Sequence, residues 1–339
     1  MRKVKTEEAV GLTLCHDITA VRDGFKGRAF QRGHVVTEAD IPKLLDLGKR
    51  HLFVWEEQAG EIHEEDAALR LAALAPSFPQ TAPSEGKVSL SAACGGLFRV
   101  NVPLLTSLNS IGDITITSLP DHYPVRRGQT VASMRIVPLV CPEPEIVEAE
   151  RRAAASETPL FQLLPYRERV KTGVIITGSE VYSGRVQDKF EPVVRRKLSA
   201  FGAEILSCTL CDDDLSMLNE AIQALLAQGA DLIVMTGGMS VDPDDLTPTA
   251  IRGSGAAVVT QGLPAQPGNM FTLAYLGKTA IVGVPGAAIH RQTTVFDVLL
   301  PQLMTGVPLG KEDLTRLGDG GLCQQCGNCH WPNCTFGRY

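Results

Sequence analysis

Residues 232–245 read Leu232-Ile-Val-Met-Thr-Gly-Gly-Met-Ser-Val-Asp-Pro-Asp-Asp245, and this stretch decides the fold class. Its first five residues are apolar or β-branched, which predicts a buried strand over 232–236. The strand runs directly into two glycines and then into a turn rich in aspartate. A strand that ends in such a loop is typical of α/β proteins, in which ligands bind beyond the carboxyl ends of parallel strands.

The residues around this stretch alternate between strand and helix patterns. We expect strands at 173–177 and 204–208, helices at 189–201 and 215–228, and further elements at 256–260, 270–276, 279–284 and 291–304. Alternation of this kind predicts parallel strands joined by crossover helices. The sequence therefore predicts an α/β domain over residues 169–310 with a sheet that is mostly parallel.

The rest of the chain divides by changes of pattern and by clusters of proline. We expect a small α+β module at 1–60, with a strand at 8–15 and a helix at 38–47. A helix and short alternating strands predict a β-rich module at 61–142. An acidic, alanine-rich segment flanked by prolines predicts a linker helix within 143–168, and a cysteine-rich tail occupies 311–339.

Composition and charge exclude several classes of protein. The 339 residues are 44% hydrophobic and 21% charged, which is typical of a folded globular protein. The formal net charge of −6 argues against nucleic acid as a partner, because phosphate backbones attract basic proteins. We find no apolar run long enough for a membrane helix and no signal-peptide core, and we expect a cytoplasmic protein.

Glycine-rich loops follow three of the expected strands. They are Thr177-Gly178-Ser179-Glu180, Thr236-Gly237-Gly238-Met239-Ser240 and Val284-Pro285-Gly286. Glycine lets backbone N–H groups approach a ligand oxygen, and a helix N-terminus adds a favourable dipole. One such loop is common after any strand, but three at equivalent strand ends favour an anion-binding edge.

Carboxylates stand beside these loops. The candidates for a site role are Glu180, Asp188, Asp242 and Asp245, with Asp244 and the run 212–214 nearby. Such carboxylates bind Mg²⁺, accept hydrogen bonds from a ribose or a pterin, or act in general acid–base catalysis. For residues 212–214, capping of the following helix is an equally good interpretation.

The tail carries the pattern Cys323-x2-Cys326-x2-Cys329-x4-Cys334. Four thiolates at this spacing are sufficient for a tetrahedral Zn²⁺ site or for a [4Fe–4S] cluster. The spacing is similar to a ferredoxin run with one extra residue, and the glycine-containing turns also suit a zinc knuckle. The sequence predicts a metal site in the tail and leaves the metal open.

Six motifs in residues 177–286 occur in one order. They are Thr177-Gly-Ser-Glu180, Gly184-Arg-Val-Gln-Asp188, Cys211-Asp-Asp-Asp214, Thr236-Gly-Gly-Met-Ser-Val-Asp-Pro-Asp-Asp245, Gln266-Pro-Gly268 and Gly283-Val-Pro-Gly286. In this order they resemble the molybdopterin-binding domain of molybdenum cofactor biosynthesis proteins. Within that superfamily the chain is more similar to molybdopterin molybdotransferase, the molybdenum insertase, than to the stand-alone adenylyltransferase.

The resemblance implies a three-layer α/β/α domain and a set of site residues. The pterin or its nucleotide would contact Thr177, Gly178, Ser179 and Glu180; the terminal phosphate would contact Gly237, Gly238 and Ser240; and the two Pro-Gly loops would contribute Pro267, Gly268, Pro285 and Gly286. The loop of residues 285–286 would line the molybdate side. Asp188 would take the place of the acid at the start of the next helix, and Asp245 that of the acid near the metal-insertion centre, with Asp242 beside it.

Two departures from the insertase pattern leave the activity open. Insertases usually carry Gly where this chain has Asp242, and Lys where it has Asn269. An added carboxylate and a lost cation both weaken a phosphate site. The resemblance implies an insertase that binds molybdopterin or adenylyl-molybdopterin and inserts molybdate or tungstate. The alternatives are a non-catalytic carrier or sensor and a Mg²⁺-dependent adenylyltransferase. A homodimer and a molybdoenzyme recipient are expected by resemblance.

Overall fold

The computed structural model describes residues 1–22, 25–55, 59–239 and 245–338. The described residues cluster into two compact units. The first contains Met1–Cys94, Phe98–Leu119 and Val125–Leu163, and the second contains Gly95–Leu97, Pro120–Pro124 and the chain from Leu164 onward.

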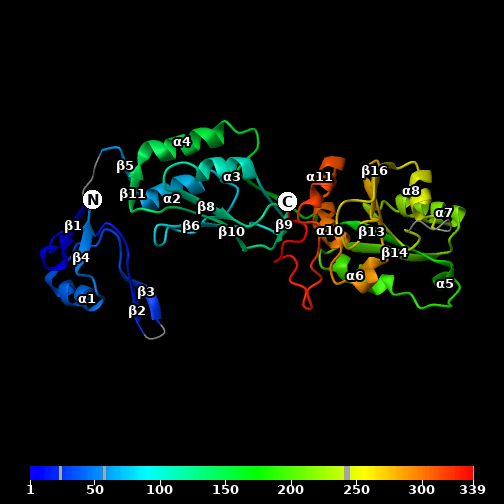
Figure 1. Ribbon diagram of the computed structural model, residues 1–339, viewed down its shortest axis with the longest axis horizontal. Coiled ribbons are helices and arrows are strands. Elements are labelled where there is room, and N and C mark those ends of the chain that lie inside the picture. The colour runs from blue at the N-terminus through cyan, green and yellow to red at the C-terminus, as the bar shows by residue number, and fades with distance from the viewer. Residues whose placement is uncertain (23–24, 56–58, 240–244, 339) are drawn as a thin grey trace. The chain divides into compact units, whose positions relative to one another are not determined.

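The second unit contains a six-stranded sheet, counted over the described residues, with the order β14-β13-β15-β18-β17-β16 (Figure 1). The strands are β13 (Lys171–Thr177), β14 (Glu204–Cys211), β15 (Leu232–Thr236), β16 (Ala257–Gln261), β17 (Thr272–Leu276) and β18 (Thr279–Val284). β13 pairs in parallel with β14 and β15, and β15 pairs in parallel with β18. β17 is antiparallel to both of its neighbours. The prediction of a mostly parallel α/β sheet is confirmed.

Helices cover both faces of this sheet and make three layers (Figure 1). The helices are α5 (Ser179–Tyr182), α6 (Phe190–Ser199), α7 (Leu215–Ala227), α8 (Thr247–Gly253), α9 (Ala287–His290) and α10 (Val295–Thr305). Side chains of α6, α9 and α10 pack in one buried cluster, and those of α7 and α8 pack in another. Successive β15 residues alternate between the clusters, because side chains along a strand point to opposite faces.

Local sequence explains where the helices begin and end. In α7, Leu218, Ile222 and Leu225 recur at helical spacing and are buried against the sheet. The carboxylate of Asp214 accepts a hydrogen bond from the amide of Met217 at 2.9 Å, as an N-cap does. Gly229 follows the helix with φ +75°, the left-handed conformation in which glycine commonly ends a helix.

The N-terminal half contains short strands and helices in several small sheets. The elements are β1 (Arg2–Lys5), η1 (Thr6–Glu8), β2 (Ile18–Arg22), β3 (Phe25–Phe30), η2 (Glu38–Asp40), α1 (Ile41–Asp46), β4 (His51–Val54), β5 (Glu61–His63), α2 (Glu64–Ala72), β6 (Val88–Ser91), β7 (Gly96–Val100), α3 (Val102–Asn109), β8 (Ile114–Ser118), β9 (Tyr123–Val125), β10 (Thr130–Ile136), β11 (Val140–Pro142), α4 (Glu143–Ala154) and β12 (Phe161–Pro165). The sheet orders are β1-β4, β2-β3, β11-β5, β6-β10-β8 and β12-β7-β9.

The strand expected at 8–15 was a wrong prediction. The chain turns through η1 and at Gly11, which has φ +82°, so that only isolated bridges form at Thr13 and Leu14. Residues 11–15 still exchange backbone hydrogen bonds with 33–36 and 53–55; for example, the amide of Leu14 donates to the carbonyl of His34 at 2.9 Å. The turns at η1 and Gly11 therefore interrupt the segment, so that only its second half pairs with neighbouring chain.

The chain ends with α11 (Lys311–Thr315), η3 (Arg316–Gly318) and the cysteine-rich tail. Beyond η3, an isolated bridge between Gln266 and Leu322 joins the tail to the loop before β17. Across the described residues, no helix is both long and apolar enough to cross a membrane.

Candidate functional site

The loops predicted to bind a ligand lie at one edge of the six-stranded sheet. The carboxyl ends of the parallel strands β13, β15 and β18 meet there, because their registers align Ile176 with Thr236 and Thr236 with Val284. β17 runs the other way, and the pairing of Thr272 with Gly283 brings the loop before β17 to the same edge. The topology therefore brings the Gly-rich loops and both Pro-Gly loops together.

The first and second glycine-rich loops are in close contact. A Cβ atom at Gly237 would lie 2.2 Å from the carbonyl oxygen of Thr177 and 2.7 Å from its Oγ1. The hydroxyl of Thr247 donates to the carbonyl of Gly237 at 2.9 Å and lies 3.4 Å from the hydroxyl of Thr177. Gly238 follows with φ +51°. Only a glycine at 237 lets the two loops approach this closely.

Carboxylates from the loop after β14 contact the first glycine-rich loop. The backbone amide of Ser179 donates to Asp213 Oδ2 at 2.9 Å, and its hydroxyl donates to Asp212. This hydroxyl, together with the amide of Asp213, holds the pKa of the Asp212 carboxyl below its ordinary value, since both stabilise the charged form. The capping interpretation applies to Asp214, whereas its two neighbours face the predicted site.

Glu180 and Asp188 occupy different environments. The Glu180 carboxyl folds back over its own loop, 3.5 Å from where a Cβ at Gly178 would lie. Asp188 accepts hydrogen bonds from the amides of Phe190 and Glu191, both at 2.8 Å. Its carboxylate thus caps the start of α6, a contact that a structural role explains without a ligand.

The predicted acids after β15 are only partly described. Ser240 and Asp242 lie outside the described residues. Asp245 is half-buried and directly precedes Leu246, the N-cap of α8. The predicted role of Asp245 near the metal-insertion centre stays a prediction.

The first Pro-Gly loop and α9, which follows the second Pro-Gly loop, line a pocket of about 620 Å³. Its walls include Pro267, Gly268, Asn269, His290 and Arg291. A Cβ at Gly286 would meet no atom within 4 Å, and the backbone there has φ −55°, which any residue adopts. Neither packing nor backbone conformation therefore requires glycine at this position.

A buried ion pair fixes the segment after α9. Lys197 and Asp297 are 7% and 8% exposed and form an ion pair. The Lys197 ammonium also donates to the carbonyl of Gln292 at 3.0 Å, and Asp297 accepts from the amide of Thr294 at 2.7 Å. These bonds hold residues 292–294, which we call the strap, against α6 and α10.

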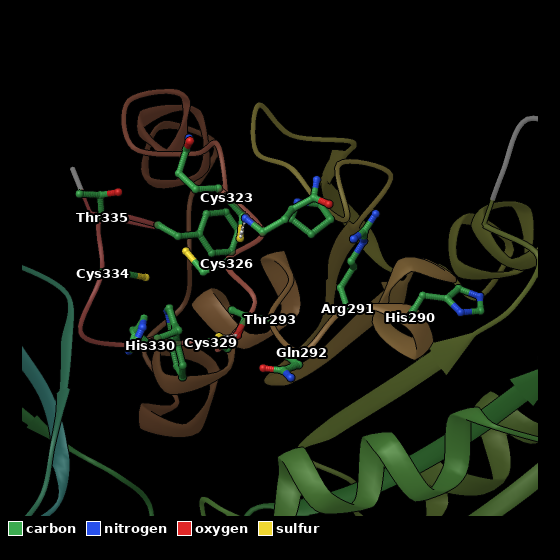
Figure 2. Close-up of a pocket in the computed structure, with 15 residues that line it drawn as sticks. His290, Arg291, Gln292, Thr293, Cys323, Cys326, Cys329, His330, Cys334 and Thr335 are labelled. Carbon is green, nitrogen blue, oxygen red and sulfur yellow. Dashed lines mark hydrogen bonds between the residues drawn. The ribbon is translucent and has the colours of Figure 1, made fainter.

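A second pocket, of about 400 Å³, lies between this strap and the cysteine tail (Figure 2). In the view shown, the tail cysteines lie on one side and Arg291 and His290 on the other. The cysteines that line it are Cys323, Cys326, Cys329 and Cys334. Pro267, His290, Arg291 and Gln325 line both pockets, so the two are adjacent.

The tail metal site stays a prediction. Within the described part of the chain, no three His, Cys, Asp or Glu side chains stand together as a metal site would require. One turn has the form of a metal knuckle: the amide of Gln325 donates to Cys323 Sγ at 3.4 Å, and Gln325 has φ +53°. An amide aimed at sulfur stabilises a thiolate, the form that binds a metal.

Sequence reasoning missed several residues at this edge. Thr247, Lys197 and Thr293 were not predicted, although each contacts a loop of the site. Lys197 follows two arginines in α6 and gives no local signal of its burial. Thr247 stands in a Leu-Thr-Pro turn, a common helix start that could have marked it.

Comparison with known families places two segments of the chain. Residues 173–305 match MoCF_biosynth, described as a probable molybdopterin binding domain. Residues 3–56 match a family described as a domain of unknown function, DUF8806.

Relatives match parts of the chain only. A CinA-like protein from Mycobacterium sp. (strain JLS) is 40% identical over 77 residues, which are 23% of this chain and 18% of the relative. The matched stretch thus spans less than a fifth of that relative's length. Among solved structures, the molybdopterin biosynthesis enzyme MoaB from Thermus thermophilus is 20% identical, with 41% of this chain and 98% of the other covered and a TM-score of 0.33. The CinA protein of unknown function from Thermoplasma acidophilum is 15% identical, with 40% and 99% covered and a TM-score of 0.36.

Proposed function

We propose, from the MoCF-type molybdopterin-binding domain that residues 173–305 form, that this chain binds molybdopterin or its adenylylated form and promotes insertion of molybdate or tungstate. The observation that carries the proposal is the convergence of the Gly-rich loops and both Pro-Gly loops on one sheet edge. Molybdopterin is a phosphorylated heterocycle with a dithiolate, so its site needs donors for the phosphate, acceptors for ring N–H groups and space for an oxyanion. This edge of the sheet offers residues for each of these.

The glycine-rich loops would hold the phosphate. Gly237 and Gly238 bring the backbone after β15 against Thr177, so that amides rather than side chains face the ligand. Ser240 would add a hydroxyl from the same loop. Amides and hydroxyls bind phosphate oxygens without a formal charge, which suits a site that also contains carboxylates.

The carboxylates near Ser179 would accept hydrogen bonds from the pterin. Asp212 and Asp213 present oxygens at the same edge, 2.9 Å from the Ser179 amide in the case of Asp213. A pterin carries an amino group and a ring N–H side by side, and a carboxylate accepts from both. Glu180 would take the same role toward the ribose of the adenylylated form.

The oxyanion would enter at the Pro-Gly loops. Gly286 has no structural reason to be glycine, which a close ligand would supply. Arg291, at the wall of the pocket that the first Pro-Gly loop lines, provides positive charge, and Asp245 would stand near the insertion centre. Promotion of the reaction would then rest on positioning of the two substrates and on electrostatic stabilisation.

A carrier or sensor is the second candidate, and Asn269 favours it. In the position where insertases have lysine, Asn269 lines the Pro-Gly pocket without charge. A site with less positive charge binds an anion without activating it. Mg²⁺-dependent adenylyl transfer would need Asp242, Asp244 and Asp245 as metal ligands, and Asp245→Ala would then abolish turnover while sparing pterin binding.

The tail would hold Zn²⁺ or a [4Fe–4S] cluster through its four cysteines. Two observations support this site: the four cysteines line one pocket, and the amide of Gln325 donates to Cys323 Sγ. Such a centre would stabilise a segment that has little core of its own. A homodimer and transfer of the product to a molybdoenzyme complete the proposal.

The deciding experiment is a titration of the purified protein with molybdopterin and with its AMP adduct, with and without molybdate. Binding together with molybdate-dependent release of AMP supports the insertase. Tight binding with no release of AMP supports the carrier or sensor. Absence of binding refutes the proposed ligand.

A further inference from the structure

The pocket between the strap and the cysteine tail has a volume of about 400 Å³, and protein contacts fix the tail around it. The amide of Gly337 donates to the carbonyl of Gly320 at 3.0 Å, so the two ends of the tail loop meet. The amide of Cys323 donates to the carbonyl of Gln266, in the first Pro-Gly loop, at 2.9 Å. Phe336, which lines the pocket, is only 2% exposed. The wall that the tail contributes is therefore anchored at both ends, as in a pocket formed before its ligand binds.

Much of the lining of this pocket is apolar. Trp331, Phe336 and Pro267 contribute ring surface, and the four tail cysteines add sulfur, which is soft and polarisable. Surfaces of this kind bind flat rings, because aromatic groups pack favourably in offset and edge-to-face arrangements. The volume lies within the usual range for small organic ligands, about 300–1,000 Å³. The apolar lining therefore suits a ligand with an aromatic ring system.

The charged part of the lining is basic. Arg291, His290 and His330 line the pocket, and the described residues around it include no aspartate and no glutamate. Within the part of the chain that the structure describes, Arg291 forms no ion pair, whereas Arg70 and Arg167 both pair with carboxylates. A guanidinium binds a phosphate or a carboxylate through two parallel hydrogen bonds. Although the whole chain has a net charge of −6, this pocket favours a ligand with an anionic group.

Carboxamide side chains complete the lining, and they are those of Gln292, Gln324 and Gln325. A carboxamide carries a donor and an acceptor side by side, which matches the edge of a nucleobase. Among the described residues, the side chains of Gln292 and Gln325 have no hydrogen-bond partner, so both are available to a ligand. The lining thus offers ring surface, amides and a cation, which are the contacts that a base and its phosphate need.

We infer that the pocket of the cysteine tail is a second ligand site, which binds a nucleoside monophosphate. The base would lie against Trp331, with its edge bonded to the glutamine amides, and the phosphate would bind Arg291. Because Arg291 also lines the pocket of the first Pro-Gly loop, the phosphate would lie toward that side. Trp331 is absent from the lining of that other pocket, which separates this site from the one proposed for molybdopterin. The inference does not depend on the proposed function.

The first test uses tryptophan fluorescence, because the chain has only two tryptophans. In Trp55→Phe, which changes a side chain that is 38% exposed in the N-terminal half, Trp331 alone reports. The full chain is titrated under reducing conditions with AMP, GMP and UMP, and with adenosine and inorganic phosphate. We expect at least one nucleotide to quench Trp331 saturably, and AMP to bind about tenfold more tightly than adenosine, because bonds to a charged group add about this factor. No saturable quenching by any of the three nucleotides, or equal affinity for AMP and adenosine, would overturn the inference.

The second test locates the phosphate by calorimetry. Arg291→Gln should weaken AMP binding by about tenfold and leave adenosine binding unchanged, since only the phosphate would contact this guanidinium. Arg316→Gln is the control, because Arg316 is an arginine of η3 that pairs with Glu312 at 2.8 Å and does not line the pocket. Its affinity for AMP should equal that of wild type. An equal loss in both variants would show general attraction by positive charge and would overturn the inference.

The third test locates the base, again by calorimetry. Trp331→Leu should weaken binding of AMP and of adenosine by about tenfold, a factor typical of lost stacking between a base and an aromatic side chain. Trp331→Phe keeps a ring and should restore most of this affinity. Wild-type affinity for AMP in Trp331→Leu would overturn the inference, as would equal losses in the two variants. Both variants should bind molybdopterin as wild type does. If no form binds molybdopterin, the proposed function fails, and the nucleotide titrations still decide the second site.

Discussion

Replacement of Gly237 by alanine tests whether the two glycine-rich loops are held together by close backbone contact. The new Cβ would lie 2.2 Å from the carbonyl oxygen of Thr177, far inside van der Waals contact. Gly237 also has φ +87°, a conformation that L residues rarely adopt. Both effects destabilise the folded unit, and they are separable.

The magnitude follows from the two contributions. A left-handed conformation costs a residue with a Cβ about 1–2 kcal/mol relative to glycine. Forcing a methyl group into a packed site typically costs about 1–3 kcal/mol more. Gly237→Ala should therefore lower the free energy of unfolding by roughly 2–5 kcal/mol. For a unit of this size each kcal/mol lowers the melting temperature by about 2–4 °C.

Gly229→Ala is the matched control. Gly229 has φ +75°, but a Cβ atom there would meet nothing within 4 Å, so only the conformational contribution applies. Scanning calorimetry of the two variants and of wild type gives the contact contribution as the difference between them. Equal melting temperatures for Gly237→Ala and Gly229→Ala would refute the close approach of the loops after β13 and β15.

Three further predictions concern other parts of the chain. Gly286→Ala should leave the melting temperature within about 2 °C of wild type, because surface changes away from strained positions are nearly neutral. The same variant should weaken molybdopterin binding, and unchanged affinity would contradict a role of Gly286 at the ligand. Lys197→Met leaves Asp297 buried without its cation and should lower the free energy of unfolding by about 3–5 kcal/mol, whereas the double variant with Asp297→Asn should recover part of this loss in urea unfolding. Hydrogen bonds from Thr37 lower the pKa of Asp40 from 3.8 to about 2, so the contribution of Asp40 to stability is present above pH 4 and is lost as the pH falls toward 2. The difference in melting temperature between wild type and Asp40→Asn should therefore shrink between pH 4 and pH 2. A constant difference would contradict the lowered pKa.

The sheet and its helices could be predicted because their signals are local. The alternation that predicts β13, β15 and α7 lies within a few residues of each element, and the observed bounds agree with the expected ones. The strand expected at 8–15 failed because the turn of η1 and the positive φ of Gly11 interrupt the segment. Such an interruption leaves the apolar pattern unchanged, so periodicity alone does not reveal it.

Residues of the candidate site were also predictable only where their sequence signal is local. Thr177 ends β13, and Gly237 and Gly286 come within two residues of the ends of β15 and β18, so motif order predicts that they share one edge of the sheet. Thr293 and Lys197 act through contacts across large sequence separations, and such contacts depend on how helices pack on the sheet. Their residue types are ordinary for a turn and a helix, and nothing nearby in the sequence marks them.

The cysteine-rich tail is closed at its base, where the amide of Gly337 donates to the carbonyl of Gly320 at 3.0 Å, and this closure has a consequence for the order of synthesis. Its contacts reach back to residues that the ribosome makes earlier, including Tyr123, Gln266 and Thr293. Domains tend to fold as the chain emerges from its N-terminal end, so the sheet can form before Cys323 is translated. Docking of the tail would then be the last step of folding, and chains that lose their final residues would keep the sheet and its glycine-rich loops while lacking one wall of the pocket.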